Sequence, residues 1–439
     1  MSVIAIRGAK PLNGTVVTSG SKNASLPILC AALLNEQPVV LHGVPALMDV
    51  TVIGEVLSSL GAQFERPLPD HTIRVDSSAA APLEPPWELV NKMRASFLVL
   101  GALLGRFGEA RVPLPGGCEI GARPVGEHLK AMHALGAEIT QEGGLIIARA
   151  KRLSGTGIYL DIASVGATEN TIMAASLASG VTTIHNAAEE PEVVDLCHFL
   201  EHCGVEIEGA GTNTVVVHGQ RRISAGVEYR VIPDRVEAGT YLLAIAATAG
   251  SGVVEGARPD HLEALVLKLR ECGVQLAVED GRIGVVHAEE LRPVDVRTAV
   301  YPGFPTDLQP QMTALLTRAA GVSTVSETIF ERRQSHVSEL VRMGARIQIS
   351  GDSAVIEGVP FIPGRATAGE HGLMGASVEA HDLRCAAALV IAGLMAGGET
   401  RVYGLHHLLR GYERLPEKII ALGGDVEYAD GDEAAAASG

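Results

Sequence analysis

A helix that ends at a glycine and leads into a strand recurs six times along this chain, and this repeat constrains the fold more than any other feature. The segments read VLSSLGAQFE, AMHALGAEIT, FLEHCGVEIE, KLRECGVQLA, LVRMGARIQI and IIALGGDVEY. Glycine tolerates the positive φ that follows many helix C-termini, and the alternating residues after it favour a strand. We therefore predict a left-handed backbone at six glycines that stand 68 to 79 residues apart: Gly61, Gly136, Gly204, Gly273, Gly344 and Gly423.

A second element also recurs six times, and it is a helix made of small apolar residues with polar residues at its start. SKNASLPILCAALL and HDLRCAAALVIAGLMAGG are the first and last examples. A helix that is apolar on nearly all sides is predicted to be buried. Each repeat then contributes one buried helix, one surface helix and several short strands, and six repeats fit two domains of three.

Composition narrows the class of protein. Hydrophobic residues make up 47% of the 439 residues but aromatic residues only 3%, so the cores are packed with small aliphatic side chains. The net charge of −16 disfavours nucleic acid or an anionic membrane as the main partner. The longest apolar run, from Cys385, is too short to cross a bilayer, and the N-terminus lacks the pattern of a signal peptide. We expect a cytoplasmic protein with six reduced cysteines, because no C-x-x-C pair occurs.

Charged residues gather at the starts of the predicted buried helices. The N-terminus of a helix carries unpaired N–H groups and a partial positive charge, so it favours anions. Asp, Asn and Thr at such positions are also ordinary caps. Lys22, Arg94 and Arg384 are not, because a cation there opposes the helix dipole. Their positions indicate a bound anion.

Several motifs resemble those of the enolpyruvyl transferases. SGSKNASLPI, LPGGCEIGARPVGEHL, SVGATEN, YPGFPTDLQ and LLRGYER carry the resemblance, which runs in order from residue 1 to about residue 428. It implies an α/β fold, a two-domain inside-out α/β barrel with six βαβαββ repeats, three in each domain. By analogy, residues 1–21 and 232–439 form the catalytic domain, and residues 22–231 form the second domain, which carries the loop with Cys118.

The resemblance also implies the reaction. An enolpyruvyl group passes from phosphoenolpyruvate to a hydroxyl of a uridine nucleotide, most closely the 3-OH of UDP-N-acetylglucosamine, and phosphate is released, as in peptidoglycan precursor synthesis. The reaction needs no cofactor and no metal, and the fifteen histidines show no metal-ligand spacing. A second acceptor, the 3′-OH of UMP, stays open because several residues on the acceptor side differ from the usual family pattern: Gly126, Glu127, Arg332, Gln334, Ser335 and Leu409.

Matching positions imply roles for individual residues. Cys118 corresponds to the general acid that can also form an adduct with phosphoenolpyruvate, and an adjacent arginine can lower the pKa of such a thiol. Asp307 corresponds to the residue that deprotonates or orients the sugar hydroxyl, although its place at a helix start also fits an N-cap. The other implied catalytic residues are Lys22, Asn23 and Asp382. The implied phosphoenolpyruvate-binding residues are Lys22, Arg94, Arg123, Arg333, Arg384 and Arg410. The implied nucleotide-binding residues are Arg123, Pro124, Val125, His128, Ser164, Val165 and Gly166.

Overall fold

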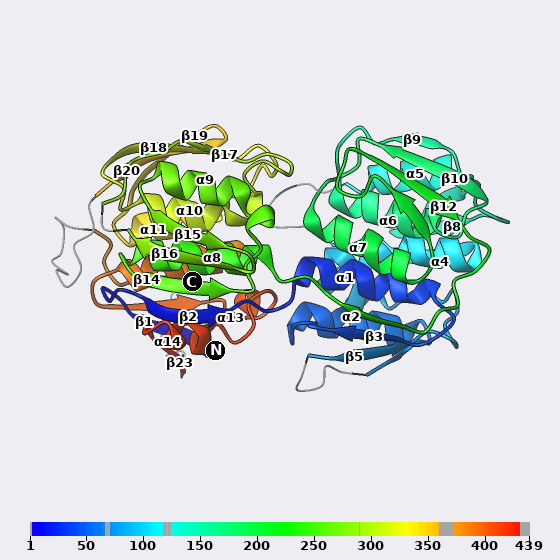
Figure 1. Cartoon of the computed structure of the whole chain (residues 1–439), viewed down its shortest axis with the longest axis horizontal. Helices are drawn as coiled ribbons and strands as arrows, with labels where there is room; N and C mark the ends of the chain where they lie inside the picture. The colour runs from blue at the N-terminus through cyan, green and yellow to red at the C-terminus, as the bar shows by residue number, and fades with distance from the viewer. Residues whose placement is uncertain are drawn as a thin grey trace. The chain divides into compact units, whose positions relative to one another are not determined.

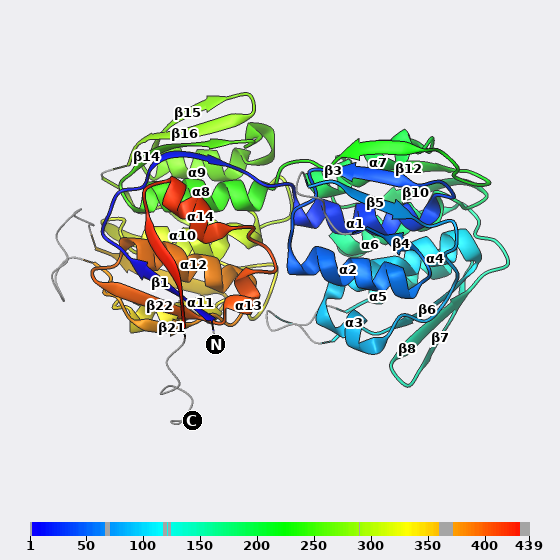
Figure 2. The same cartoon turned by 90° about the horizontal axis from the view of Figure 1, so that it is seen from below.

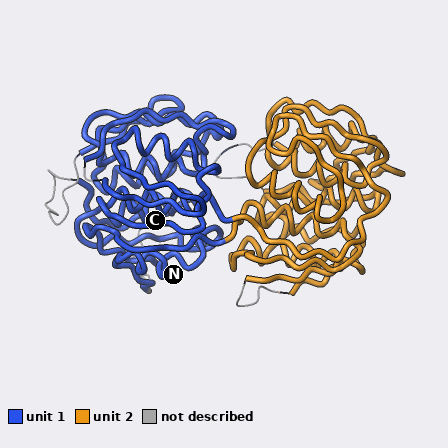
Figure 3. The backbone as a smooth tube through the Cα atoms, in the orientation of Figure 1, with its two compact units in different colours: residues 1–19, 119–122, 233–439 blue, residues 20–118, 123–232 orange. Residues whose placement is uncertain are grey.

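The computed structural model describes residues 2–65, 71–116, 121, 124–288, 290–359 and 372–430. Two of the predicted site residues, Cys118 and Arg123, lie outside the described residues. The chain divides into two compact units, which Figure 3 colours separately. Unit 1 consists of residues 1–19, 119–122 and 233–439, and unit 2 consists of residues 20–118 and 123–232.

Unit 2 places three largely buried helices inside and its sheets outside (Figure 1). The inner helices are α1 (Lys22–Ala31), α4 (Val99–Phe107) and α6 (Val165–Ala175). The other α-helices described in this unit are α2 (Met48–Ser59), α3 (Trp87–Lys92), α5 (Gly126–Ala134) and α7 (Pro191–His202). Almost every residue of α1 and α6 is buried, as the absence of a polar face in these segments predicts.

Three sheets surround these helices in the described part of unit 2. In spatial order, the first contains β13 (Val227–Arg230), β3 (Val39–His42), β5 (Ile73–Asp76) and β4 (Gln63–Phe64). The second contains β11 (Glu206–Glu208), β12 (Thr214–Gly219), β10 (Gly180–His185) and β9 (Gly157–Tyr159). The third contains β6 (Glu109–Pro113), β8 (Leu145–Arg149) and β7 (Glu138–Glu142).

Unit 1 has the same plan, with its own inner helices and a separate hydrophobic core. The inner helices are α8 (Arg235–Ala247), α10 (Gln309–Leu316) and α12 (Leu383–Met395). The remaining α-helices described in this unit are α9 (Glu263–Glu271), α11 (Ser335–Arg342), α13 (Leu405–Leu408) and α14 (Leu415–Ala421). The small side chains of α12 and its neighbours let these helices approach closely, which suits a chain with few aromatic residues.

Three four-stranded sheets surround the inner helices in the described part of unit 1. In spatial order, the first contains β15 (Gln275–Glu279), β16 (Arg282–His287), β14 (Ser251–Glu255) and β2 (Asn13–Val17). The second contains β19 (Arg346–Ser350), β20 (Ser353–Gly358), β18 (Gly321–Ser326) and β17 (Val296–Arg297). The third contains β23 (Asp425–Asp430), β1 (Ser2–Arg7), β22 (Glu399–Tyr403) and β21 (Ser377–Glu379).

The predicted repeat is visible in chain order and in the sheets. Elements β9, α6, β10, α7, β11 and β12 follow one another as βαβαββ, and β17, α10, β18, α11, β19 and β20 do the same. Other repeats include strands from distant parts of the sequence, since β1 pairs with both β22 and β23 while β2 lies parallel to β14. Figure 2 shows β1 beside β22. The N-terminal strands therefore complete two sheets of unit 1, and β13 completes a sheet of unit 2 by pairing with β3.

The six repeat glycines adopt the predicted left-handed backbone. Their φ angles lie between +84° and +98° at Gly61, Gly136, Gly204, Gly273, Gly344 and Gly423. Each follows a surface helix and precedes a strand or an extended segment, so the local signal in the sequence is confirmed. The cysteines described are all free and buried, as expected for core residues: Cys30, Cys197, Cys203, Cys272 and Cys385.

Candidate active site

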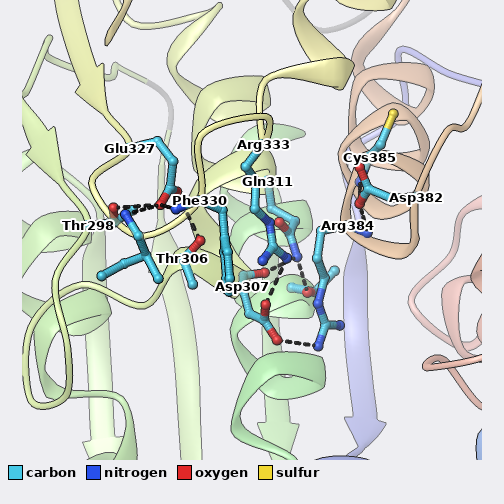
Figure 4. Close-up of polar contacts among 12 residues, drawn as sticks. Thr298, Thr306, Asp307, Gln311, Glu327, Phe330, Arg333, Asp382, Arg384 and Cys385 are labelled. Atoms are coloured by element: carbon cyan, nitrogen blue, oxygen red, sulfur yellow. Dashed lines mark hydrogen bonds and ion pairs between the residues drawn. The ribbon is translucent and has the colours of Figure 1, made fainter. Parts of the chain in front are cut away.

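Asp307 is the centre of the densest cluster of charged side chains predicted for the site. It lies in the 3-10 turn η4 (Thr306–Leu308), which leads directly into α10. Its Oδ1 atom accepts a hydrogen bond of 2.7 Å from Arg333 Nη2, and its Oδ2 atom accepts one of 2.8 Å from Arg384 Nη2 (Figure 4). The carboxylate makes no cap for its own turn. Both guanidinium groups instead stabilise its ionised form.

The two arginine side chains of this cluster are buried more deeply than the aspartate that they bind. The side chains of Arg333 and Arg384 are only 4% and 5% exposed, whereas that of Asp307 is 26% exposed. Burial lowers the pKa of Arg384, but Asp307, Tyr412 and Asp234 together outweigh it, so the pKa is raised. Two buried cations thus hold an anion that still faces an accessible side, where a hydroxyl group can donate a hydrogen bond to it.

A fully buried tyrosine links Arg384 to two inner helices. The hydroxyl of Tyr412 lies 3.1 Å from Arg384 Nη1, 3.1 Å from Gln311 Nε2 and 2.9 Å from Thr240 Oγ1. Gln311 also donates to the backbone oxygen of Asp307 at 3.0 Å. These hydrogen bonds join helices α8, α10 and α12 to the segment after α13. They hold Arg384 and the backbone of Asp307 in place.

Glu327 holds the loop in which Asp307 lies. This buried carboxylate accepts hydrogen bonds from the hydroxyls of Thr298 at 3.1 Å and Thr306 at 2.9 Å, as Figure 4 shows. It also accepts from the backbone N–H groups of Ile329 and Phe330. One acidic side chain thereby joins the loop before α10 to the segment that leads to Arg333.

Asp382 begins α12 as its N-cap. Its Oδ1 atom accepts from the backbone N–H groups of Arg384 at 2.8 Å and Cys385 at 3.0 Å. Its Oδ2 atom accepts from the hydroxyl of Ser335 at 2.8 Å. Burial raises the pKa of Asp382, but the hydrogen bonds from Cys385 and Ser335 and the charge of Arg333 outweigh it, so the pKa is lowered. The carboxylate is therefore ionised at neutral pH.

Other predicted cations lie at the starts of inner helices or just beyond helices. Lys22 is the first residue of α1, after the cap Ser21, and its Nζ atom lies 3.4 Å from Asp49 Oδ2. Asn23 follows in the same turn. Arg94 begins the 3-10 turn η2 (Arg94–Leu98), which leads into α4. Arg410 follows α13, two residues before Tyr412.

The predicted nucleotide-binding residues of unit 2 meet at the start of α6. The hydroxyl of Ser164 caps this helix by accepting from Ala167 N, and Val165 and Gly166 form its first turn. A Cβ atom at Gly166 would lie 3.1 Å from His128 Cε1, so glycine lets the imidazole approach the helix start. The backbone N–H groups of such a turn are suited to a diphosphate.

His128 comes from α5, whose first residues follow Pro124 and Val125. Its Nδ1 atom lies 2.8 Å from Asn170 Nδ2, and Asn170 Oδ1 accepts from Gly101 N at 2.8 Å. With the amide in this orientation, Nδ1 accepts a hydrogen bond and the neutral imidazole carries its proton on Nε2. Asn170 therefore fixes the tautomer of a predicted nucleotide contact.

Within the described residues, one group of side chains has the spacing of metal ligands. Glu206, Glu208 and His218 have ligand atoms within 4.8 Å of one another, and His218 Nε2 lies 3.0 Å from Glu208 Oε1. They lie on the outer sheet strands β11 and β12, and both glutamates are exposed. The predicted site residues are not among them.

Sequence reasoning missed several polar residues that hold the site together. Tyr412 lies inside the quoted motif LLRGYER and Gln311 lies just beyond YPGFPTDLQ, but no pattern indicates that their side chains meet. Asn170 is the last residue of the quoted motif SVGATEN, but the motif does not indicate its hydrogen bond to His128. Ser335 was noted only as a difference from the family pattern, and its contact with Asp382 has no signal in the sequence.

Comparison with known proteins identifies the class. The family model described as EPSP synthase (3-phosphoshikimate 1-carboxyvinyltransferase) matches residues 6–419. Among solved structures, the enolpyruvyl transferase NikO from Streptomyces tendae matches with a TM-score of 0.87 at 28% identity, covering 98% of this chain and 99% of that one. EPSP synthase from Acinetobacter baumannii shares the fold, with a TM-score of 0.76 at 19% identity over 98% of this chain and 100% of that one. The chain belongs to the enolpyruvyl transferase family.

Within that family, the sequence is much more similar to one group of curated relatives. It is 48% identical to UDP-N-acetylglucosamine 1-carboxyvinyltransferase 1 of Caldanaerobacter subterraneus subsp. tengcongensis, over 96% of this chain and 98% of the relative. It is 50% identical to UDP-N-acetylglucosamine 1-carboxyvinyltransferase 2 of Carboxydothermus hydrogenoformans, over 97% of this chain and 99% of the relative. None of the helices in the described residues is long and apolar enough to cross a membrane.

Proposed function

We propose that this protein transfers the enolpyruvyl group of phosphoenolpyruvate to the 3-OH of UDP-N-acetylglucosamine and releases inorganic phosphate. The observation that carries the proposal is a single carboxylate, Asp307, held between two buried guanidinium groups with one side accessible. Sequence identity of 46 to 50%, over 96 to 98% of this chain, to transferases named for this acceptor supports the substrate class.

The proposed role of Asp307 follows from its geometry. Because both carboxylate oxygens are held by Arg333 and Arg384, the side chain cannot turn freely, and its accessible side can accept a hydrogen bond from the acceptor hydroxyl. This contact orients the hydroxyl oxygen toward the electrophilic C2 of phosphoenolpyruvate, and the Asp307 carboxylate accepts the hydroxyl proton as the C–O bond forms. The same two guanidinium groups suit the donor's carboxylate or phosphate.

The donor-side proposal carries over the cations that the family resemblance implies. Lys22, Arg94 and Arg410 are proposed to bind phosphoenolpyruvate, as are the arginines at Asp307. Cys118 is proposed to protonate the methylene carbon of the donor, and Arg123 to bind its phosphate. Addition of the hydroxyl and this proton gives a tetrahedral intermediate, from which phosphate leaves and the C3 proton is removed to restore the enol ether.

UMP is the alternative acceptor, and it is not favoured. The sequence differences that kept it open include Glu127, Gln334 and Ser335. Each of these side chains makes a hydrogen bond inside its own unit: Glu127 accepts from Asp161 N, Gln334 donates to the oxygen of Asp352, and Ser335 donates to Asp382. Internal contacts account for these polar side chains without a different acceptor.

The proposal is tested by turnover of purified protein with phosphoenolpyruvate and each acceptor. Phosphate release and product mass are expected with UDP-N-acetylglucosamine, and the 3-deoxy analogue of the same nucleotide sugar is expected to give none. UMP, at the same phosphoenolpyruvate concentration, is the competing substrate. A kcat/KM for UMP at least about tenfold above that for UDP-N-acetylglucosamine, about 1.4 kcal/mol in transition-state binding, would replace the proposal with the alternative.

A further inference from the structure

The two arginines that hold Asp307 come from segments that are themselves joined. Arg333 lies two residues before Ser335, the first residue of α11. Arg384 lies two residues after Asp382, the N-cap of α12. The hydroxyl of Ser335 donates to Asp382 Oδ2 at 2.8 Å, so the start of α11 is tied to the start of α12.

These contacts form a closed ring. Starting at Asp307, the ring passes through Arg333 at 2.7 Å, along the chain to Ser335, across to Asp382 at 2.8 Å, along the chain to Arg384, and back to Asp307 at 2.8 Å. The two stretches of backbone in the ring are equally short. Arg333 is two residues from Ser335, and Arg384 is two residues from Asp382. A change in the spacing of the two helix starts therefore moves both guanidinium groups relative to one carboxylate.

The charges around the ring are fixed at neutral pH. The Asp382 carboxylate that receives the Ser335 hydroxyl is ionised, and it faces the charge of Arg333. His336, the next residue of α11, is fully buried, and burial lowers its pKa to about 4. The imidazole is therefore neutral at pH 7 and adds no cation that would compete with the two arginines.

We infer that Ser335 is a positioning residue for the transfer reaction: its hydroxyl closes the ring, sets the spacing of Arg333 and Arg384, and so orients the Asp307 carboxylate. The inference rests on the proposed function, in which Asp307 contacts the acceptor hydroxyl. Ser335 itself contacts no substrate in this scheme. Its effect is expected in the chemical step, where orientation of the hydroxyl matters most, and not in ground-state binding of the acceptor.

The kinetic test uses four variants. Ser335→Ala removes the hydroxyl and is expected to lower kcat about tenfold with KM for UDP-N-acetylglucosamine within about twofold of the parent, while KM for phosphoenolpyruvate is expected to rise because Arg333 and Arg384 are also proposed to bind the donor. Ser335→Thr restores the donor and is expected to recover at least half of kcat, while Ser335→Cys keeps the shape with a weak donor and is expected to lower kcat. Ser338→Ala is the matched control, because Ser338 is exposed on the same helix and bonds only to the backbone oxygen of Ser335 among the described contacts.

A second readout does not depend on turnover. The Nε–Hε NMR signals of Arg333 and Arg384, assigned through Arg→Lys variants, are expected to shift in Ser335→Ala and to stay in place in Ser335→Thr and Ser338→Ala. Unchanged kcat and unshifted signals in Ser335→Ala would overturn the inference, as would a loss of kcat that Ser335→Thr does not restore. If the parent protein does not turn over UDP-N-acetylglucosamine, the proposed function fails, and the arginine signals still decide the role of Ser335.

Discussion

Two of the three inner helices in each unit begin with a side-chain cap, and the caps of the two units differ chemically. In unit 2, α6 begins after Ser164, a neutral hydroxyl that accepts one backbone N–H group. In unit 1, α12 begins after Asp382, an ionised carboxylate that accepts two. The pair α1 and α8 repeats the difference with Ser21 and Asp234. The side-chain caps of these two pairs of helices are thus hydroxyls in unit 2 and carboxylates in unit 1.

This difference decides what each unit can bind at its helix starts. A helix N-terminus carries roughly half a positive charge, and a carboxylate cap neutralises it while a hydroxyl cap does not. The starts of α1 and α6 keep their attraction for an anion, and Lys22 adds to it at α1. The start of α12 instead offers a negative partner to cations such as Arg333. We therefore expect the nucleotide phosphates on unit 2.

The largest expected effect on turnover is at Asp307 of unit 1. Asp307→Asn keeps the shape of the side chain but leaves Arg333 and Arg384 facing a neutral amide. We expect kcat to fall by about 10² to 10³ or more, the range measured when one transition-state contact is removed. Phosphate release measures the effect, and circular dichroism checks that the protein is folded. Asp280→Asn, an exposed position in the same unit, serves as the control, and retention of a tenth of the parent kcat by Asp307→Asn would contradict the assignment.

The next prediction compares how a buried titratable group in each unit changes protein stability as the pH falls. Burial lowers the pKa of His336 in unit 1 from 6.5 to about 4, so the unfolded chain binds more protons than the folded chain between these values. This group therefore contributes stability above pH 6.5 that is lost as the pH falls toward 4, up to about 3 kcal/mol. Urea denaturation of His336→Leu at pH 4.5, 5.5 and 7 is expected to show a smaller loss toward pH 4.5 than the parent.

Asp195 in unit 2 is expected to have the opposite effect on how stability depends on pH. Burial raises its pKa from 3.8 to about 6, although hydrogen bonds from the Tyr229 hydroxyl and from Ile232 N oppose the shift. The folded chain binds more protons here between pH 3.8 and 6, so this group's contribution to stability falls as the pH rises through that window. Asp195→Asn is expected to flatten that fall. The same direction of change in Asp195→Asn and His336→Leu would show that the two groups do not oppose each other.

The repeat was predictable from the sequence because its signals are local. A glycine after a helix and an apolar helix without a polar face each depend on a few neighbouring residues, as at Gly273 and in α8. The ring around Asp307 was not predictable, because its members come from three segments and are joined only by the packing of α10, α11 and α12. Ser335 shows the limit clearly. As a difference from the family pattern it kept a second acceptor open, while its hydroxyl donates a hydrogen bond to Asp382 inside unit 1.

A fourth prediction adds a negative charge at the start of α6 in unit 2. Ser164→Asp keeps an oxygen that can cap α6 but adds a negative charge where we expect the nucleotide diphosphate. We expect KM for UDP-N-acetylglucosamine to rise about thirtyfold, with KM for phosphoenolpyruvate changed less and thermal stability maintained. Ser179→Asp adds the same charge at an exposed residue beyond the other end of α6 and serves as the control. Equal KM values in the two variants would contradict the expectation that unit 2 binds the nucleotide phosphates through this helix.

The smallest expected effect compares two arginines at equivalent places in the middle repeat of each unit. Arg318, 4% exposed, follows α10, and its guanidinium donates to the backbone oxygens of Ala246 and Ala247 at the end of α8 at 2.8 and 2.9 Å. Arg106, near the end of α4, is half-buried and donates to the backbone oxygen of Leu33 at 2.6 Å. Both supply a cation and donors to the carbonyl end of an inner helix.

Lysine keeps the charge at these positions but cannot reproduce the planar fork. Burial lowers the pKa of Arg318 to about 10 already, so a lysine there is harder to keep charged than one at Arg106. We expect Arg106→Lys to lower the free energy of unfolding by about 1 kcal/mol and Arg318→Lys by about 1 kcal/mol more. Urea denaturation can assign the losses, because Trp87, the chain's single tryptophan, reports on unit 2 by fluorescence while circular dichroism reports on both units. Equal losses would mean that depth of burial does not determine how much a guanidinium at the end of an inner helix stabilises its unit.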